Sequence, residues 1–419
     1  MSTVALSEQL AVWLDDPAFG PLTRIGTLSR CGLDSVRFSY AAAWLQHPTA
    51  FQLDPSLSLS AGDFFPRDSN FGVFLDSCPD RWGQVLMKRR ELVQAKAQAR
   101  TRRELRAWDF LLGVQDITRM GALRFSHATD NGAPTFLANE ALAAPPVTQL
   151  GALQQVALEL SRKKLDDLSL LEQWLKVLVA PGASLGGARP KANLTGDGSS
   201  LWIAKFPAED DDADVALREK LVHDLARQSG IHVPPSRLER IGYGYHTFLV
   251  QRFDRVQGRR KFFTSAMALL NKTDKEEASY LDLAEFIATQ GSPAHIQADL
   301  HQLFRRVVFN VITANRDDHL RNHGFIRTPE GWRLAPAFDM NPSIKRETHV
   351  LALDDRDSSP DLATVLATAG FYRLSQTQAR SLMVAVMTAV SQWAQHAQQL
   401  GMSGEERAEL EGVFLLQYL

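Results

Sequence analysis

The sequence has little cysteine, no long apolar run and no clear excess of charge, and each of these absences narrows the class of protein. Only Cys31 and Cys78 occur among 419 residues. Two thiols in so long a chain indicate a reducing compartment and exclude a disulfide scaffold. No apolar stretch approaches the roughly 20 residues that a membrane-spanning helix needs. Residues 1–16 lack a basic segment and contain two early aspartates, so we expect no signal peptide. These absences predict a cytoplasmic protein without a membrane partner.

The charge balance argues against a general attraction to nucleic acid. The chain has 46 Lys and Arg against 48 Asp and Glu, for a net charge of -2. Hydrophobic residues make up 45% and charged residues 22%, a normal globular composition that excludes disorder. There is no internal repeat and no low-complexity tract. The length fits two or three domains.

The first region, residues 1–130, indicates a small mixed α/β subdomain. Apolar residues alternate along 10–14 and 36–40, as they do in half-buried strands. Residues 78–106 have the composition of a helix, and residues 121–125 indicate a short strand. A Pro-, Ala- and Gly-containing stretch follows and predicts a linker at residues 131–147.

Two further regions follow the linker. Residues 148–254 are predicted to form a strand-rich lobe, and residues 255–419 a helical lobe with the catalytic and metal-binding loops. The first lobe is predicted to contain a helix at 150–179, a Gly-rich loop at 181–188, a hairpin at 191–206, a helix at 215–229 and a strand at 245–253. The helical lobe is predicted to contain helices at 281–289, 296–314, 362–369 and 375–399. This order predicts an α+β, bilobal protein-kinase-like fold.

The most informative residues are three polar side chains in a fixed order. Asp317 is followed by Asn322 five residues later and by Asp339 seventeen residues after that. Phosphoryl transfer from ATP uses one carboxylate to orient the acceptor hydroxyl, and an Asn and a second carboxylate to hold Mg²⁺. Asp317 is therefore a candidate base, and Asn322 and Asp339 are candidate metal ligands. An Asp-rich turn alone more often caps a helix, but the ordered Asn and Asp favour the phosphoryl-transfer interpretation.

A lysine and a glutamate upstream extend this pattern. Lys205 lies on an apolar strand, where an unpaired lysine is costly to bury. It is a candidate contact for the ATP phosphates, and Glu219 on the next helix is its candidate partner. Each alone is more often a solvated surface residue. Residues 251–254 end a buried-looking strand where a bilobal kinase has its hinge, whose backbone would bind adenine, and an ordinary exit from a strand into a turn is the alternative.

The loop at residues 182–187 could bring backbone N–H groups close to phosphate oxygens because it is rich in glycine. An ordinary turn remains the alternative, and the loop is not a Walker A motif, since no Gly-Lys-Ser/Thr follows. His319 and His323 are spaced four residues apart, but the chain lacks H-E-x-x-H and its cysteines lie far upstream, so we do not expect zinc.

Together these segments resemble the HipA-type serine/threonine kinases, the toxins of bacterial HipBA toxin–antitoxin modules. Residues 184–191 resemble the family's S-x-x-G-A-x-x-K loop, and residues 317–322 its D-x-H-x-x-N loop. Residues 334–339 resemble L-x-P-x-Y-D, with Phe338 in place of Tyr, and residues 250–255 resemble V-E-R-F-D-R, with Gln251 in place of Glu. In the N-terminal region, segments 26–29, 38–40, 57–59 and 121–125 also follow the family order, whereas residues 60–77 depart from it.

The resemblance implies a role for each site residue. Ser184 would be an autophosphorylation site whose modification extracts the loop and inactivates the enzyme, because its added charge of about -1.5 to -2 repels the ATP phosphates. The remaining implied nucleotide-binding residues are Gly186, Gly187, Lys205, Gln251, Phe253 and His319. Asp317 would be the base, and Asn322 and Asp339 would hold Mg²⁺.

The resemblance also implies partners. These are a helix-turn-helix antitoxin similar to HipB, operator DNA reached only through the antitoxin complex, and a protein substrate such as an aminoacyl-tRNA synthetase. Two alternatives stay open at this point: a catalytically weak HipA-like protein that acts as an antitoxin-binding co-repressor, and a small-molecule kinase.

Overall fold

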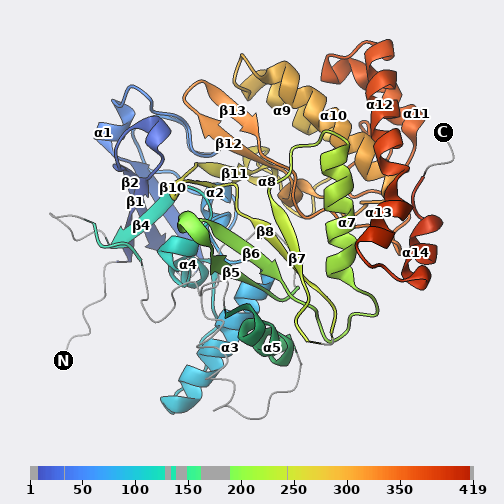
Figure 1. The fold of residues 1–419 in the computed structure, drawn as a ribbon. Coiled ribbons are helices and arrows are strands. Elements are labelled where there is room, and N and C mark those ends of the chain that lie inside the picture. Colours follow the sequence, from blue (N-terminus) through green and yellow to red (C-terminus); the bar gives the residue numbers. More distant parts are fainter. Residues whose placement is uncertain are drawn as a thin grey trace, which may run out of the picture. The chain divides into compact units, whose positions relative to one another are not determined.

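The computed structural model describes residues 8–32, 34–127, 134–137, 149–161, 189–242 and 244–415. The chain divides into two compact units, one of residues 1–203 with 254–264 and one of residues 204–253 with 265–419. Figure 1 labels most of the helices and strands of both units. The domain boundaries that the sequence suggests at residues 130, 147 and 254 stay predictions.

The first unit contains a four-stranded antiparallel sheet with the strand order β3-β2-β1-β4. Its strands are β1 (Gln9–Leu14), β2 (Thr23–Cys31), β3 (Ser35–Tyr40) and β4 (Leu123–His127). The strands predicted at residues 10–14 and 36–40 are confirmed. Gly26 in β2 leaves room for a core ring, because a Cβ there would lie 2.4 Å from the ring of Phe38.

The other elements of the first unit are mostly short. They are α1 (Ala42–Leu45), α2 (Gly72–Leu75), α3 (Arg81–Ala97), α4 (Ala107–Leu112), α5 (Leu150–Ser161), β5 (Lys191–Thr195), β9 (Arg255–Val256) and β10 (Arg259–Arg260). Strands β6 (Leu201–Lys205) and β11 (Phe263–Ser265) span the points where the chain passes between the units. The short 3-10 helices of this unit are η1 (Pro17–Phe19), η2 (Asp116–Thr118) and η5 (Asp197–Ser199), and those of the second unit are η6 (Leu320–Asn322) and η7 (Ala369–Tyr372).

Helix α3 ends earlier than the sequence predicts. It begins after Asp80, whose carboxylate accepts a hydrogen bond from the backbone of Gly83 at 2.8 Å, and it ends at Ala97 instead of continuing to residue 106. Beyond the helix Ala99 adopts a φ of +48°, in the left-handed region, so the chain turns back there. Arg100 then donates two hydrogen bonds, of 2.5 and 3.1 Å, to the buried carboxylate of Glu91.

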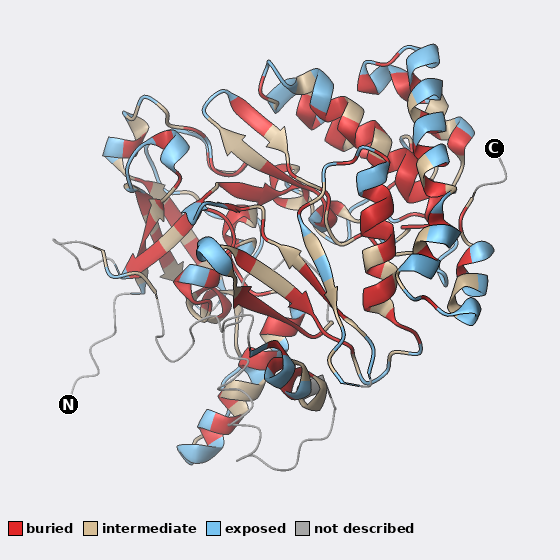
Figure 2. Ribbon diagram, viewed as in Figure 1, coloured by how far each residue is buried: buried red, intermediate tan, exposed pale blue. Residues whose placement is uncertain are grey.

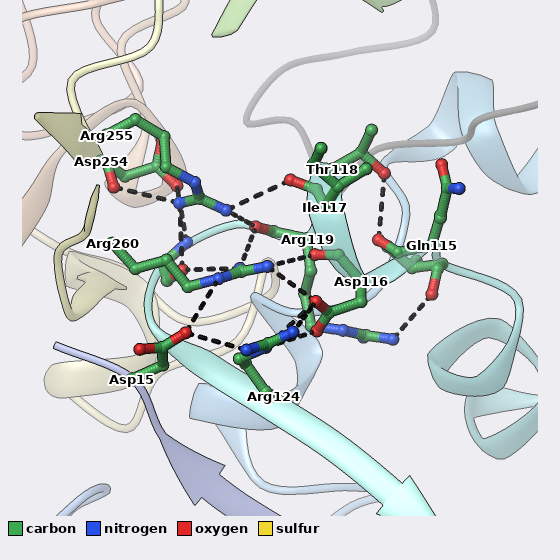
Figure 3. A network of polar contacts seen from close by, with 12 residues as sticks. Asp15, Gln115, Asp116, Ile117, Thr118, Arg119, Arg124, Asp254, Arg255 and Arg260 are labelled. Carbon is green, nitrogen blue, oxygen red and sulfur yellow. Dashed lines mark hydrogen bonds and ion pairs between the residues drawn. The ribbon is translucent and has the colours of Figure 1, made fainter. Parts of the chain in front are cut away.

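A buried polar network holds the 254–260 segment within the first unit (Figure 3). Asp116 accepts hydrogen bonds from Arg124 at 2.6 Å and from Arg260 at 3.1 Å. Asp254 accepts one from the backbone of Gly121 at 2.7 Å. Each guanidinium has a carboxylate or carbonyl partner, so the network buries charge without leaving the charge uncompensated.

The second unit is mainly helical. Its elements are α7 (Val215–Gln228), β7 (Ser236–Glu239), β8 (Thr247–Gln251), α8 (Ala266–Leu269), α9 (Tyr280–Gln290), α10 (Ile296–Ile312), β12 (Gly324–Thr328), β13 (Gly331–Leu334), α11 (Leu362–Ala367), α12 (Gln376–Val390), α13 (Trp393–Gln399) and α14 (Gly404–Glu411). Helix α10 packs against α9 and α12 and is buried along most of its length, whereas α14 is largely exposed (Figure 2).

Most predicted helices of this unit are confirmed, with two differences. The segment at 375–399 forms two helices, because the chain turns at Ser391 and Gln392. The antiparallel hairpin of β12 and β13 was not predicted. Its turn needs Gly331, whose φ is +154° and whose Cβ would lie 2.7 Å from the backbone nitrogen of Ser292. In the described part of the chain, no helix is both long and apolar enough to cross a bilayer.

Candidate active site

The site is centred on Lys205, the last residue of β6. Its Nζ lies 2.5 Å from Glu219 Oε1 on α7 and 2.5 Å from Asp339 Oδ1, and its side chain is 7% exposed. Burial acts to lower the pKa of Lys205, but the charges of Asp339 and Glu219 outweigh burial and raise it. The ammonium group therefore stays charged at neutral pH. The structure brings together all three residues that the sequence places in this part of the site.

Asp339 has a strained backbone. Its φ is +58°, in the left-handed region that residues other than glycine seldom adopt. Such conformations cost on the order of 1–3 kcal/mol and gather at functional sites. Its side chain is 21% exposed, so the carboxylate can contact a ligand while it holds Lys205.

The predicted hinge residues lie near this aspartate. Gln251 ends β8, and its backbone N–H donates to Pro235 O at 2.9 Å. The ring of Phe253 stacks on the ring of Phe338 with centroids 5.6 Å apart, and Phe338 directly precedes Asp339. The hinge segment and the Asp339 segment thus meet through two aromatic rings.

The loop after α10 carries the proposed base and a proposed metal ligand. The Asp317 side chain is 64% exposed and lies 3.2 Å from Arg346 Nη2, so a substrate can reach it. Asn322 in η6 is buried, and its Nδ2 donates to Asp317 O over a long 3.4 Å. Asn322 Oδ1 is buried without a hydrogen-bond partner among the described residues, and the same holds for His319 Nδ1.

These residues fit a magnesium ion. Buried polar atoms without partners are uncommon in folded proteins, and the free Asn322 Oδ1 is available as a ligand. Mg²⁺ prefers hard oxygen ligands, usually one or two from the protein with phosphates completing the set. Asn322 Oδ1 and the Asp339 carboxylate are such oxygens. No group of three or more His, Cys, Asp or Glu that could hold a metal occurs within the described ranges.

Two backbone contacts tie the Asp339 segment to the loop after α10. Asn341 N donates to Asn315 Oδ1 at 3.1 Å, and Ser343 N donates to Ala314 O at 2.8 Å. Ser343 Oγ in turn accepts from Asp317 N at 3.2 Å. Sequence reasoning missed these residues. The sequence offered one indication of these contacts: Asn315 lies two residues before Asp317, and Asn341 lies two residues after Asp339.

Asp318 was also missed, although it adjoins Asp317. It is 3% exposed, and its Oδ2 accepts from Tyr280 OH at 2.7 Å, Asn310 Nδ2 at 2.8 Å and His323 Nε2 at 2.6 Å. Burial acts to raise the pKa of Asp318, but the charge and hydrogen bond of His323 outweigh it, so the pKa is lowered. The Nε2 of His323 is therefore taken up by its hydrogen bond to Asp318. The two adjacent aspartates therefore have opposite surroundings.

The glycine-rich loop with Ser184, Gly186 and Gly187 lies outside the described residues. The strand that follows it, β5, is described, and its first residue, Lys191, forms a buried ion pair from Nζ to Asp80 at 2.9 Å. This pair fixes the start of β5 to the N-terminus of α3.

The charged Lys205 lies between Glu219 on a helix and Asp339. Together with the loop that carries Asp317 and Asn322, this arrangement defines a protein-kinase-like site. The family model of the HipA-like C-terminal domain matches residues 183–394, and that of the HipA N-terminal domain matches residues 10–126. The chain therefore belongs to the HipA family.

Two curated relatives match over part of their length. The serine/threonine-protein kinase toxin HipA of Shewanella oneidensis is 27% identical over 194 residues, which cover 38% of this chain and 43% of that protein. A putative kinase of Haemophilus influenzae is 28% identical over 181 residues, which cover 38% of this chain and 52% of that protein. The chain thus spans about half the length of the curated relatives it matches.

A solved structure agrees over almost the whole chain. A chain of the Shewanella oneidensis MR-1 complex of HipA, HipB and operator DNA has a TM-score of 0.68 and 18% identity. The match covers 96% of this chain and 94% of that one. The similarity shows the fold and confirms the predicted α+β, kinase-like class.

Proposed function

We propose that this protein is an ATP- and Mg²⁺-dependent serine/threonine protein kinase that acts in the cytoplasm as the toxin of a toxin–antitoxin module. The observation that carries the proposal is the contact of Lys205 with both Glu219 and Asp339. A charged lysine held in this way can bind the phosphates of ATP. Backbone groups of Gln251 and Phe253 hold the adenine, and His319 contributes to the nucleotide site.

The exposed Asp317 orients the acceptor hydroxyl of the substrate for in-line attack on the terminal phosphate of ATP. Its carboxylate accepts the hydroxyl proton as the new P–O bond forms and the bond to ADP breaks. Arg346 must leave Asp317, or shift on it, for a hydroxyl to approach. When bound at Asn322 and Asp339, Mg²⁺ supplies positive charge that offsets the charge on the transferred group.

The proposed partners follow from the family. A helix-turn-helix antitoxin similar to HipB binds the chain, and the solved HipA complex with HipB and operator DNA supports this assignment. With a net charge of -2, the chain reaches DNA through the antitoxin. The substrate is a translation-related protein such as an aminoacyl-tRNA synthetase.

Phosphotransfer from labelled ATP into cell extract tests the activity. We expect labelled protein with the wild type and at least about a hundredfold less with Asp317→Asn, since general-base groups contribute about 10²–10⁴ to rate. Equally poor labelling by both proteins would contradict kinase activity and favour an antitoxin-binding co-repressor. Label that appears only in small molecules would identify a small-molecule kinase.

The proposed self-inactivation at Ser184 has its own test. Mass spectrometry after incubation with Mg-ATP should find phosphate on Ser184 in the wild type, and Ser184→Ala should stay active for longer. Absence of phosphate at this position would remove self-inactivation from the proposal and leave the kinase activity in place.

A further inference from the structure

We propose that Asp318 and His323 are positioning residues that set the separation between the proposed base Asp317 and the proposed metal ligand Asn322. This inference rests on the proposed kinase function and assigns two residues that the phosphoryl-transfer pattern does not include. With Tyr280 and Asn310 they form a group that we call the loop clamp.

Two residues of the loop directly follow the proposed base and the proposed metal ligand. Asp318 directly follows Asp317, and His323 directly follows Asn322. His323 Nε2 donates to Asp318 Oδ2 at 2.6 Å. This hydrogen bond therefore joins the residue after the base to the residue after the metal ligand. By contrast, the direct contact from Asn322 Nδ2 to Asp317 O is long, at 3.4 Å.

The loop clamp is fixed to the helices beneath it. Tyr280 begins α9 and Asn310 lies on α10, and both donate to the same oxygen of Asp318, at 2.7 and 2.8 Å. Asn310 Nδ2 also donates to Tyr280 OH at 3.1 Å. All four side chains are at most 3% exposed. A carboxylate with three buried donors has little freedom to move, so the loop is held in one conformation.

The position of the loop clamp excludes a direct role in binding substrate. Asp317 points to solvent with a 64% exposed side chain, while Asp318 is buried below it. The clamp acts through the backbone, because Asp318 directly follows the proposed base and His323 directly follows the proposed metal ligand. Loss of a group that hydrogen-bonds to a metal ligand typically weakens metal affinity 10- to 100-fold, and we expect the lower end of this range for a group that acts through the backbone.

The chain offers a matched control in Asp224. This carboxylate is also buried and accepts hydrogen bonds from His396 at 3.1 Å and from Lys220 at 2.7 Å. It lies on α7 and contacts none of the loop residues that are named above. Asp224→Asn therefore removes a buried carboxylate–histidine pair without touching the loop clamp.

The test measures Mn²⁺ affinity by electron paramagnetic resonance with a non-hydrolysable ATP analogue present. We expect Asp318→Asn and His323→Phe to weaken Mn²⁺ binding about tenfold or more. His323→Gln keeps an N–H donor and should stay within about threefold of wild type, and Asp224→Asn should match wild type. Unchanged affinity in His323→Phe, or equal weakening in Asp224→Asn, would overturn the proposal. If Asp318→Asn does not fold, the two His323 variants decide the outcome.

Hydrogen exchange of the loop separates this inference from the kinase proposal. Amides of residues 313–323 should exchange faster in His323→Phe than in wild type, and at the wild-type rate in His323→Gln. Equal exchange in all three proteins would overturn the loop clamp even if phosphotransfer is observed. Faster exchange in His323→Phe alone would support the clamp even if the wild type transfers no phosphate and the kinase proposal fails.

Discussion

One ammonium group, that of Lys205, contacts one carboxylate that is near in the sequence and one that is distant. Glu219 is the near one, and an apolar strand followed by a helix was enough to suggest that pair. The contact with Asp339, 134 residues away, depends on tertiary structure that no local pattern encodes. Spacing alone selected Asp317 as the base, but it did not show that Asp317 is exposed while Asp318 is buried, because that difference depends on α9 and α10 and not on the immediate neighbours.

Replacement of Lys205 tests the phosphate contact. Lys205→Met should lower phosphotransfer about a hundredfold or more, in line with the loss of one preorganised electrostatic contact. It also leaves the carboxylates of Glu219 and Asp339 without their shared cation. Lys220→Met is the control, because Lys220 directly follows Glu219 on α7 but forms its ion pair with Asp224 and not with the site. A rate assay with purified protein compares the two, and similar losses would contradict the assigned role.

His349 predicts a pH dependence of stability. It is 3% exposed, and burial lowers its pKa to about 4 although the charge of Asp318 opposes the shift. In the unfolded chain this histidine has a pKa near 6.5 and therefore binds a proton at a higher pH than it does in the folded protein. The contribution of the neutral His349 to the free energy of unfolding is thus complete above about pH 6.5 and is lost as the pH falls toward 4. Between pH 7.5 and 5 the loss is about 2 kcal/mol.

Urea unfolding at the two pH values measures this effect. His349→Gln should lose about 2 kcal/mol less than the wild type between pH 7.5 and 5, because glutamine does not titrate. The same loss in both proteins would show that other groups account for the pH dependence.

At the scale of elements, long periodic segments were predictable and short ones were not. Helices α7, α9 and α10 were found because their apolar spacing persists over several turns. The β12–β13 hairpin has strands of only five and four residues, within a region of helical patterns. Its signal was the Pro-Glu-Gly turn at residues 329–331, which alone was too weak to outweigh that background.

Gly331 tests the importance of that hairpin. Gly331→Ala places a Cβ 2.8 Å from Gly291 O in a backbone conformation with φ +154°, and we expect a loss of about 1–3 kcal/mol in the free energy of unfolding. Gly370→Ala is the control, because its Cβ would meet no atom within 4 Å and its φ is not positive. Denaturant unfolding compares them, and equal stability would show that the hairpin tolerates the change.

At the scale of the molecule, the described residues of the proposed site lie in one unit, and the Asp116 network lies in the other. The fold class could be predicted, because a strand-rich region precedes a helical one. The division into these units could not, because residues 254–264 belong with the N-terminal residues through contacts of Asp116 and Asp254 that are far apart in sequence.

Asp116→Ala separates stability from nucleotide binding. It leaves Arg124 and Arg260 with a partner missing, and breaking a buried pair typically costs about 3–5 kcal/mol. We expect a lower melting temperature but the same increase in melting temperature on addition of Mg²⁺ and an ATP analogue. Calorimetry with and without the analogue measures both quantities, and a reduced increase would show that the network influences the site.

At Asp339, selection for stability and selection for phosphotransfer favour different residues. A left-handed conformation is easily adopted by glycine and tolerated by asparagine, whereas aspartate holds it at some cost to the fold. A library randomised at residue 339 and sorted only for heat resistance should therefore enrich glycine or asparagine. The same library sorted for phosphotransfer should return aspartate alone. In a lineage where phosphotransfer is no longer under selection, replacement of Asp339 would relieve the backbone strain without a functional loss, so we expect this aspartate to be lost early.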